Sequence, residues 1–383
     1  MARRRSSSTA TAPFRRRITA LRRACSRAKV DALLVTDPTD VGYLTGFLGG
    51  DSYLVVTPSG KPVLISDNRY EEDLQAFGSL VSIRMRVGSI LAEVGATLAD
   101  TGMFAGRSKT RLGIQGEHMT LAQHVALRSA LKDHRIPASS VTTTKGLVSD
   151  LRARKDDTEV ALIRKAVRIQ QQALEATLEI VEPGLSEFEI CAELEYQMKS
   201  RGSTEPAFHP IVGAKANSSR PHYEPAKAKT ANNSLLLIDW GATWKGYRSD
   251  MTRTFAIGKW PTRMAEVYDI VLEAHQAAAA ALKPGALCKS IDAVARDVIT
   301  AAGYGDRFGH GLGHGLGMHV HEEPRLSKLA GTQRLEPGHV VTIEPGIYLP
   351  GIGGVRIEDD YLITNTGARN LCTLPKTRRW STL

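Results

Sequence analysis

The sequence is poor in cysteine, and the few cysteines that it has lie far apart. Cys25, Cys191, Cys288 and Cys372 are the four cysteines of 383 residues, and no two of them form a CxxC pair. This spacing argues against a zinc knuckle and against a dithiol redox motif. Isolated cysteines are typical of reducing compartments, so we expect a cytoplasmic location.

Long apolar runs are also missing. No run approaches the ~20 residues that a membrane-spanning helix needs, and the N-terminus lacks the apolar stretch of a secretory signal. We therefore expect no membrane partner. The length of 383 residues exceeds that of one typical domain and favours two.

Acidic residues are absent from the first 30 positions, where ten arginines and lysines lie. The whole chain has 50 basic and 40 acidic residues, so the remainder has 50 − 10 = 40 basic against 40 acidic residues. The net charge of +10 therefore belongs to the N-terminus. We interpret residues 1–13 as a disordered basic arm, whose Arg- and Ser-rich composition resembles a transit peptide. We expect no nucleic-acid partner except through this arm.

Residues 14–150 alternate between predicted helices and strands. A basic amphipathic helix is expected from Phe14 to Lys29, and another helix from Thr120 to Leu131. The predicted strands between them are Ala32–Thr36, Tyr53–Val56, Val63–Ile65 and Val81–Val87. This pattern predicts a small α/β domain, and nothing in it clusters like a metal site.

A charged segment, Leu151–Asp157, begins the second predicted domain, residues 151–383. The long helix that follows has an apolar stripe made of Leu162, Ala166, Ile169, Ala173, Thr177 and Ile180. Pro183-Gly184 ends this helix, and a capping box of Ser186 and Glu189 begins the next one.

The second domain contains an internal repeat. Pro183-Gly184 and Gly202 recur as Pro284-Gly285 and Gly303, an offset of 284 − 183 = 101 residues. A unit of helices followed by strands thus occurs twice, at about 158–258 and 264–365. A repeat of this length predicts two half-domains around a pseudo-twofold axis, with ligands at the seam drawn from both.

Four carboxylates occupy matching places in the two copies: Asp239 and Asp250 in the first, Glu344 and Glu358 in the second. Each copy has an apolar run, a carboxylate, a glycine, and a second carboxylate two residues after an arginine. A β-hairpin would place the two carboxylates of a copy side by side. Buried carboxylates repel one another, and two divalent cations about 3.5–4 Å apart would hold them ionised together.

Histidines lie in and just after a glycine-rich segment between the copies. Three of them, His310, His314 and His321, are candidate site residues. A GxGxxG-like run alone is weak evidence for a dinucleotide site, and histidines beside four carboxylates are better explained as metal ligands and proton carriers. Oxygen ligands with one imidazole suit Mn²⁺, our first choice, and also Co²⁺, Zn²⁺ or Fe²⁺.

Together these motifs resemble the M24 "pita-bread" metallopeptidases, in particular their two-domain branch of aminopeptidase P and prolidase (Xaa-Pro dipeptidase). The resemblance extends from about residue 15 to Lys376. Residues 14–150 resemble the creatinase-type N-terminal domain of that branch, with Tyr43–Phe47 and Asp67–Tyr70 in its style. The resemblance implies an α+β fold, with a pita-bread catalytic domain over residues 151–383.

The resemblance also assigns roles to matching positions. The implied ligands of two divalent ions are Asp239, Asp250, His314, Glu344 and Glu358, of which Asp250 and Glu358 would bridge the ions. The implied catalytic residues are His222, His310, His321, Glu344 and Arg356. Glu344 would accept a proton from the metal-bound water, which attacks as hydroxide, and one metal and His321 would stabilise the oxyanion. His222 and His310 would line the pocket for proline.

The implied activity is that of a metallo-exopeptidase, which hydrolyses the N-terminal Xaa-Pro bond of dipeptides or short peptides with a free N-terminus. A homodimer is expected by analogy. The alternatives are a methionine aminopeptidase, which typically lacks such an N-terminal domain, a metal-free creatinase, and a non-catalytic binding protein. The presence of all five ligands argues against the last two. Dipeptidase or aminopeptidase P preference stays open, because it depends on the loops beyond the proline.

Overall fold

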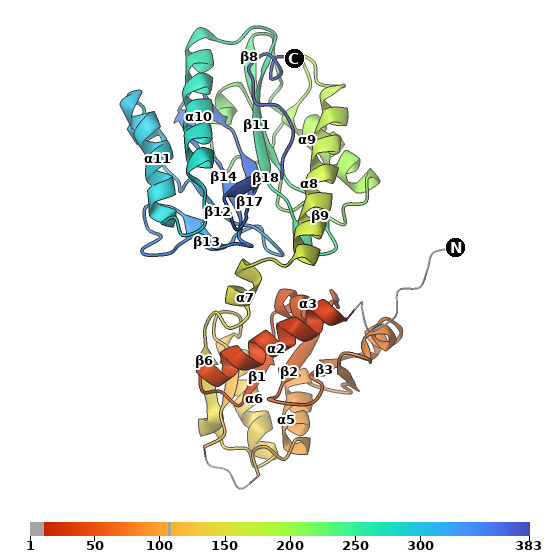
Figure 1. Cartoon of the computed structure of the whole chain (residues 1–383). Helices are drawn as coiled ribbons and strands as arrows, with labels where there is room; N and C mark the ends of the chain where they lie inside the picture. The colour runs from red at the N-terminus through yellow and green to blue at the C-terminus, as the bar shows by residue number, and fades with distance from the viewer. Residues whose placement is uncertain (1–10, 106–108) are drawn as a thin grey trace, which may run out of the picture. The chain divides into compact units, whose positions relative to one another are not determined.

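We describe the fold from a computed structural model, in which residues 11–105 and 109–383 are described (Figure 1). The chain divides into two compact units, residues 1–152 and 153–383. None of the helices in these ranges is both long enough and apolar enough to cross a membrane. The first ten residues of the predicted basic arm lie outside the described residues. Ala12 and Pro13 already belong to the first helix, so the arm was predicted too long; proline suits a helix start because it needs no N–H partner there.

The first unit contains a six-stranded sheet. Its strands are β1 Ala32–Val35, β2 Tyr53–Val56, β3 Val63–Ser66, β4 Ser82–Met85, β5 Leu112–Gln115 and β6 Val141–Thr144, in the order β4-β3-β2-β1-β5-β6. Its helices are α2 Ala12–Arg27, α3 Pro38–Thr45, α4 Glu71–Leu74, α5 Ile90–Asp100, α6 Leu121–Asp133 and α7 Ser149–Ala153, with 3-10 turns η1 Asn68–Tyr70, η2 Gln75–Phe77 and η3 Ala138–Ser140. Strands β1, β5 and β6 are parallel, whereas β2 is antiparallel to both of its neighbours. Apolar side chains of α5 and α6, such as Leu98 and Leu131, pack on this sheet.

The second unit begins with two helices and a three-stranded sheet. These elements are α8 Asp157–Leu178, α9 Glu187–Ser200, β7 Ile211–Ala214, η4 Lys215–Ser219, β8 Ser234–Trp240, β9 Thr243–Trp244, β10 Tyr247–Arg248 and β11 Met251–Ile257. Capping boxes begin both helices, from Asp156 and Glu159 in α8 and from Ser186 and Glu189 in α9. The strand order is β11-β8-β7, and all pairs are antiparallel.

The rest of the second unit repeats this plan with a larger sheet. It comprises α10 Thr262–Ala281, α11 Cys288–Ala301, η5 Gly305–Arg307, β12 Gly313–Gly315, β13 Glu322–Leu326, β14 Val340–Ile343, β15 Gly346–Leu349, β16 Gly353–Arg356, β17 Asp359–Ile363 and β18 Ala368–Asn370. The sheet order is β13-β12-β14-β17-β18.

The two halves of the second unit share one connection. In the first, β8 and β11 are antiparallel neighbours joined through the ribbon β9–β10; in the second, β14 and β17 are joined through the ribbon β15–β16. Within each half the two helices pack together, α8 with α9 and α10 with α11, and Figure 1 shows the pairs flanking the strands. The predicted duplication and α+β class are confirmed.

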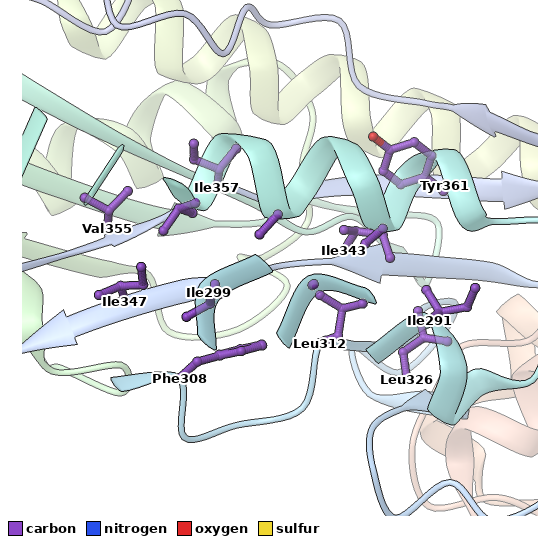
Figure 2. Close-up of a cluster of buried hydrophobic side chains, with 14 of the residues drawn as sticks. Ile291, Ile299, Phe308, Leu312, Leu326, Ile343, Ile347, Val355, Ile357 and Tyr361 are labelled. Carbon is purple, nitrogen blue, oxygen red and sulfur yellow. The ribbon is translucent and has the colours of Figure 1, made fainter. Parts of the chain in front are cut away.

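A buried apolar cluster supports the strands that lead to the second pair of carboxylates. Its members Ile343, Val355 and Ile357 are fully buried, and Figure 2 shows them together with other members of the cluster, such as Leu312 and Tyr361. Interiors packed this closely have little freedom to relax. The cluster therefore holds the ends of β14 and β17, beyond which Glu344 and Glu358 lie.

The buried face of α8 differs from the predicted stripe at both ends. Leu162 is only half-buried, whereas its neighbour Ile163 is fully buried. Ile180 is 44% exposed because the helix ends at Leu178. Periodicity alone cannot choose between adjacent apolar residues at the edge of a stripe.

Gly241, the glycine that follows Asp239 in the first copy, lies in close contact with the chain around Ser249 and Ala207. An added Cβ at Gly241 would run into the carbonyl oxygen of Ser249 and the side chain of Ala207, so Gly241→Ala must displace backbone. We expect the free energy of unfolding to fall by about 1–3 kcal/mol, as in other overpacked sites. Gly367→Ala, where an added Cβ meets nothing within 4 Å, is the matched control. Equal urea midpoints for the two variants would contradict the close approach.

Candidate metal centre and active site

The hairpin registers bring the four carboxylates to the same place. Asp239 in β8 lies opposite Thr252, and Asp250 precedes Thr252 by two residues, so both acids are on one face of the hairpin. In the second half Ile343 lies opposite Asp359. The next pair outward in this register is Glu344 and Glu358.

The two halves meet at these hairpins. The Glu358 N–H donates to the carbonyl oxygen of Thr252 at 3.1 Å, and the Thr254 hydroxyl donates to the carbonyl of Arg356 at 3.0 Å. The Thr252 hydroxyl donates to Glu358 Oε2 at 2.7 Å. The carboxylates of both copies therefore share one seam, as the duplicated sequence predicted.

His314 presents one ring nitrogen to this seam. Its Nδ1 lies 3.0 Å from the carbonyl oxygen of Gly315, which makes Nδ1 the protonated nitrogen. Its Nε2 lies 3.6 Å from Asp250 Oδ2 and 3.5 Å from Glu344 Oε1. Burial, and next the neighbouring His321, lower the pKa of His314 to about 3, so the ring is neutral. A neutral imidazole with a free Nε2 is a ready metal ligand.

The clustered carboxylates repel one another in the absence of a cation. Burial, and next Glu358 and Asp239, raise the pKa of Asp250 well above its ordinary value. Burial and Glu358 do the same for Glu344, and burial and Asp239 raise the pKa of Glu358 to about 8. The Arg356 guanidinium opposes these shifts at Glu344 and Glu358 but does not outweigh them.

Unsatisfied oxygens mark where a cation fits. Asp239 Oδ1 and Asp250 Oδ1 are buried and have no hydrogen-bond partner among the described residues. Ligand atoms of Asp250, His314 and Glu358 all lie within 4.8 Å of one another. A buried carboxylate oxygen is costly unless it is paired or coordinated. The set of carboxylates and one neutral imidazole therefore fits divalent metal ions.

A second cluster of possible ligands lies in the first unit and fits a metal poorly. It consists of Asp37, Asp40 and His118. Both oxygens of Asp40 are occupied, one by the Arg152 guanidinium and the other by the Gln115 amide. A buried guanidinium already compensates these acids, so we assign this cluster to the packing of the first unit.

Arg356 connects the ligands of both halves. It is 2% exposed, and its Nη2 donates to Asp239 Oδ2 at 2.6 Å. Its Nε donates to the Thr252 hydroxyl at 3.0 Å, which in turn donates to Glu358. Its Nη1 donates to the Tyr348 hydroxyl at 2.7 Å. One fixed guanidinium thus orients a carboxylate from each copy.

His310 lies at the end of the same chain of hydrogen bonds. Its Nε2 is 2.9 Å from the Tyr348 hydroxyl, and its Nδ1 is 2.8 Å from the Gly311 carbonyl and 3.9 Å from Glu344 Oε2. Since Tyr348 accepts from Arg356, it donates to Nε2, and Nδ1 carries the proton. Burial, and next Arg356, lower the pKa of His310 to about 4 and keep the ring neutral.

His321 and His222 lie at the exposed edge of the group. The His321 ring meets the His314 ring edge-on, with centroids 4.4 Å apart. Burial, and next the charge of His222, lower the pKa of His321. Pro221, beside His222, accepts a hydrogen bond from Arg356 at 3.4 Å. The structure therefore brings all the predicted site residues into one region of the second unit.

Glu187 was missed as a site residue by sequence reasoning. It is fully buried, and its Oε1 accepts from the Ala214 N–H at 2.7 Å and the Asn217 amide at 2.9 Å. Its Oε2 accepts from the Tyr223 hydroxyl at 2.7 Å and the Ala226 N–H at 3.0 Å. The carboxylate thus fixes the turn that carries His222. In the sequence it looks like an ordinary acid in the first turn of a helix.

Both units of the chain match known protein families. The model of metallopeptidase family M24 matches residues 161–365, and that of the creatinase/prolidase N-terminal domain matches residues 17–154. The chain belongs to metallopeptidase family M24. The M24 chain is 36% identical to the uncharacterized peptidase YqhT of Bacillus subtilis, over 93% of the chain and 97% of that protein.

Solved structures agree with this assignment over both units. An Xaa-Pro dipeptidase from Bacillus anthracis superposes with a TM-score of 0.89 and 34% identity, covering 97% of the M24 chain and all of that chain. An X-Pro aminopeptidase from Thermotoga maritima has a TM-score of 0.81 and 31% identity, covering 93% and 99%. The predicted family, the two-domain architecture and the metallopeptidase class are confirmed.

Loss of one ligand should empty the metal site without unfolding the chain. Asp250→Asn and His314→Ala each remove a group that faces the other ligands. We expect hydrolysis to fall about 100-fold or more, since electrostatic stabilisation is usually the largest part of catalysis. Asp269→Asn, an exposed acid on α10 paired with Arg378, is the matched control. Metal content after dialysis, turnover and circular dichroism are measured; unchanged metal content and turnover in the ligand variants would refute the assignment.

Relative to the Glu358→Gln variant, the metal-free wild type should lose stability as the pH rises from 6.5 to 8. The folded state keeps a proton on Glu358 up to about pH 8, whereas the unfolded chain releases it near the ordinary value of 4.5. The unfolded state thus binds fewer protons, and the free energy of unfolding falls by up to about 1.4 kcal/mol per pH unit for each such proton. Near pH 6.5 the unfolded chain still protonates histidines that are neutral in the folded state, which adds an opposing slope, but this slope is the same in the wild type and in Glu358→Gln.

Urea unfolding with a chelator at several pH values measures the slope in both proteins. Glu358→Gln should lack the contribution of Glu358, and added Mn²⁺ should abolish this contribution in the wild type, because cations compensate the ionised carboxylates. An identical slope in the wild type and in Glu358→Gln would show that the carboxylates do not repel one another as described.

Proposed function

We propose that the chain is a metal-dependent exopeptidase, which hydrolyses the N-terminal Xaa-Pro bond of dipeptides or short peptides. The observation that carries the proposal is the buried group of mutually repelling carboxylates beside the neutral His314, in a chain of metallopeptidase family M24. The similar solved structures are those of an Xaa-Pro dipeptidase and an X-Pro aminopeptidase, and these activities support the choice of bond.

In this proposal five residues hold two divalent ions, with Mn²⁺ as the first choice: Asp239, Asp250, His314, Glu344 and Glu358. When bound, such a pair supplies Lewis acidity and an activated water at neutral pH. Arg356 keeps Asp239 oriented, and the Thr252 hydroxyl keeps Glu358 oriented, so the ligands need little rearrangement.

Glu344 is the proposed proton carrier. Its carboxylate is buried and surrounded by like charges, which favour its protonated form, so it readily accepts a proton at Oε2. His310 Nδ1 faces this oxygen at 3.9 Å. The neutral His310 ring can steady the protonated carboxyl without adding a positive charge that would repel cations.

His321 and His222 are proposed to contact the peptide. Both lie at the exposed edge of the group, where substrate can reach them. His321 is neutral at physiological pH and would donate to the developing oxyanion, a contact made mainly in the transition state. His222 would contact the proline ring of the substrate. The nitrogen of an Xaa-Pro bond has no N–H that could donate a hydrogen bond.

Assembly and location complete the proposal. We propose a homodimer in the cytoplasm. The four cysteines are buried and unpaired, as expected of a reducing compartment.

A matched peptide panel tests the proposed function. Purified protein with Mn²⁺ or Co²⁺ is assayed on an Xaa-Pro dipeptide, the corresponding Xaa-Ala dipeptide, an Xaa-Pro-Xaa tripeptide, an N-acetylated Xaa-Pro dipeptide and a Met-Ala peptide. We expect cleavage of free Xaa-Pro substrates at least about tenfold faster than that of Xaa-Ala, because a single specific pocket contact contributes 1–3 kcal/mol. The acetylated peptide should resist cleavage.

Two outcomes would contradict the proposal. Cleavage of the Met-Ala peptide alone would indicate a methionine aminopeptidase. Absence of any hydrolysis, together with no bound metal after dialysis, would indicate a non-catalytic member of the family. The ratio of dipeptide to tripeptide turnover decides between the dipeptidase and aminopeptidase P forms of the proposed activity.

A further inference from the structure

A buried ion pair joins the start of the second unit to the segment that carries His321. Lys155 Nζ lies 3.0 Å from Glu322 Oε2, and the two side chains are 1% and 4% exposed. The same ammonium donates to the Ala153 carbonyl oxygen at 3.2 Å. The partners are 167 residues apart in the sequence, so the contact exists only in the folded chain.

The other oxygen of Glu322 fixes the backbone on the far side of His321. Glu322 Oε1 accepts from the His319 N–H at 2.9 Å, and the His319 carbonyl accepts from the Gly317 N–H at 3.0 Å. Gly317 makes room for the pair: an added Cβ would lie 2.5 Å from Glu322 Oε2 and 2.9 Å from Lys155 Cε. His321 is thus held between two residues that this single carboxylate positions.

The ring of His321 in turn packs edge-on against His314, whose Nε2 faces Asp250 and Glu344. We propose that Lys155 and Glu322 form a positioning pair, which sets the place of the His321 ring relative to the metal ligands. This inference rests on the proposed function, in which His321 contacts the reacting peptide.

Stability alone is a poor explanation for such a pair. Removing two charges from water costs several kcal/mol per ion, and apolar replacements of buried pairs are often neutral or stabilising. Removal of one partner is strongly destabilising, because it leaves a buried charge uncompensated. An apolar replacement of a purely structural pair would thus keep full activity, whereas an apolar replacement of a positioning pair would not, because it also removes the oxygen that fixes the backbone beside His321.

Two double variants separate these roles. Lys155→Met with Glu322→Gln removes both charges but keeps an oxygen that can accept from the His319 N–H. Lys155→Met with Glu322→Leu removes the charges and the acceptor. Arg154→Met, which breaks the neighbouring exposed pair with Glu336, is the control. Circular dichroism and urea unfolding establish that each variant is folded.

We expect the Leu variant to lose about tenfold or more in kcat on an Xaa-Pro dipeptide, with KM within about threefold, since a contact made in the transition state is weakened. The Gln variant should retain most of the wild-type kcat, and Arg154→Met all of it. In metal-free protein with isotope-labelled histidine, the His321 ring resonances, assigned with His321→Gln, should shift in the Leu variant and not in the control.

Wild-type kcat in a folded Leu variant, or a rise in KM with kcat unchanged, would overturn the inference. Unshifted His321 resonances in the Leu variant would overturn it as well. If the wild type cleaves no Xaa-Pro peptide, the proposed function fails, and the resonance experiment still decides whether the pair positions His321.

Discussion

Mutual repulsion among buried carboxylates is the constraint on which the second unit depends, because the fold gathers more negative charge at one seam than its own cations compensate. The pKa values of Asp250 and Glu344 are raised well above their ordinary values, and that of Glu358 to about 8. Such a group is tolerable when protonated or when metal ions are bound. Bound cations would let the carboxylates ionise together, so divalent metal ions are the natural partner of the site.

The duplicated fold explains how this charge is brought together. Each half contributes a hairpin whose strand ends deliver two acids, and hydrogen bonds from Glu358 and Thr254 across the seam keep the hairpins in register. Arg356 is the principal cation within reach, and it contacts Asp239 directly. A single guanidinium orients the ligands but cannot neutralise the charge of all four carboxylates. The remaining negative charge favours the binding of cations.

Buried charged residues outside the group of carboxylates position the histidines at the exposed edge of the site. Glu187 accepts four hydrogen bonds around the turn that carries His222, and the Lys155–Glu322 pair brackets His321. Both carboxylates lie outside the ligand set. The segments that carry His222 and His321 are thus fixed by buried hydrogen bonds, as the ligands are, but these bonds come from other parts of the chain.

The fold class and the duplication could be predicted from the sequence, because the carboxylates recur at matched spacing in a long repeat. The same spacing predicted that the carboxylates of both copies would meet at one seam. Glu187, Lys155 and Tyr348 could not be found in this way. Their partners are distant in sequence, and each looks locally like a helix-end acid, a charged boundary residue or a strand tyrosine. The stripe of α8 was wrong at Leu162 and Ile180 for the same reason: helical periodicity says nothing about where the neighbouring strands and the helix end lie.

Anomalous diffraction from crystals of the protein grown with Mn²⁺ tests the central claim most directly. The account predicts two anomalous peaks about 3.5–4 Å apart, with Asp250 and Glu358 between them and His314 Nε2 at one of them. A single peak, or peaks that avoid the seam between the two hairpins, would contradict it.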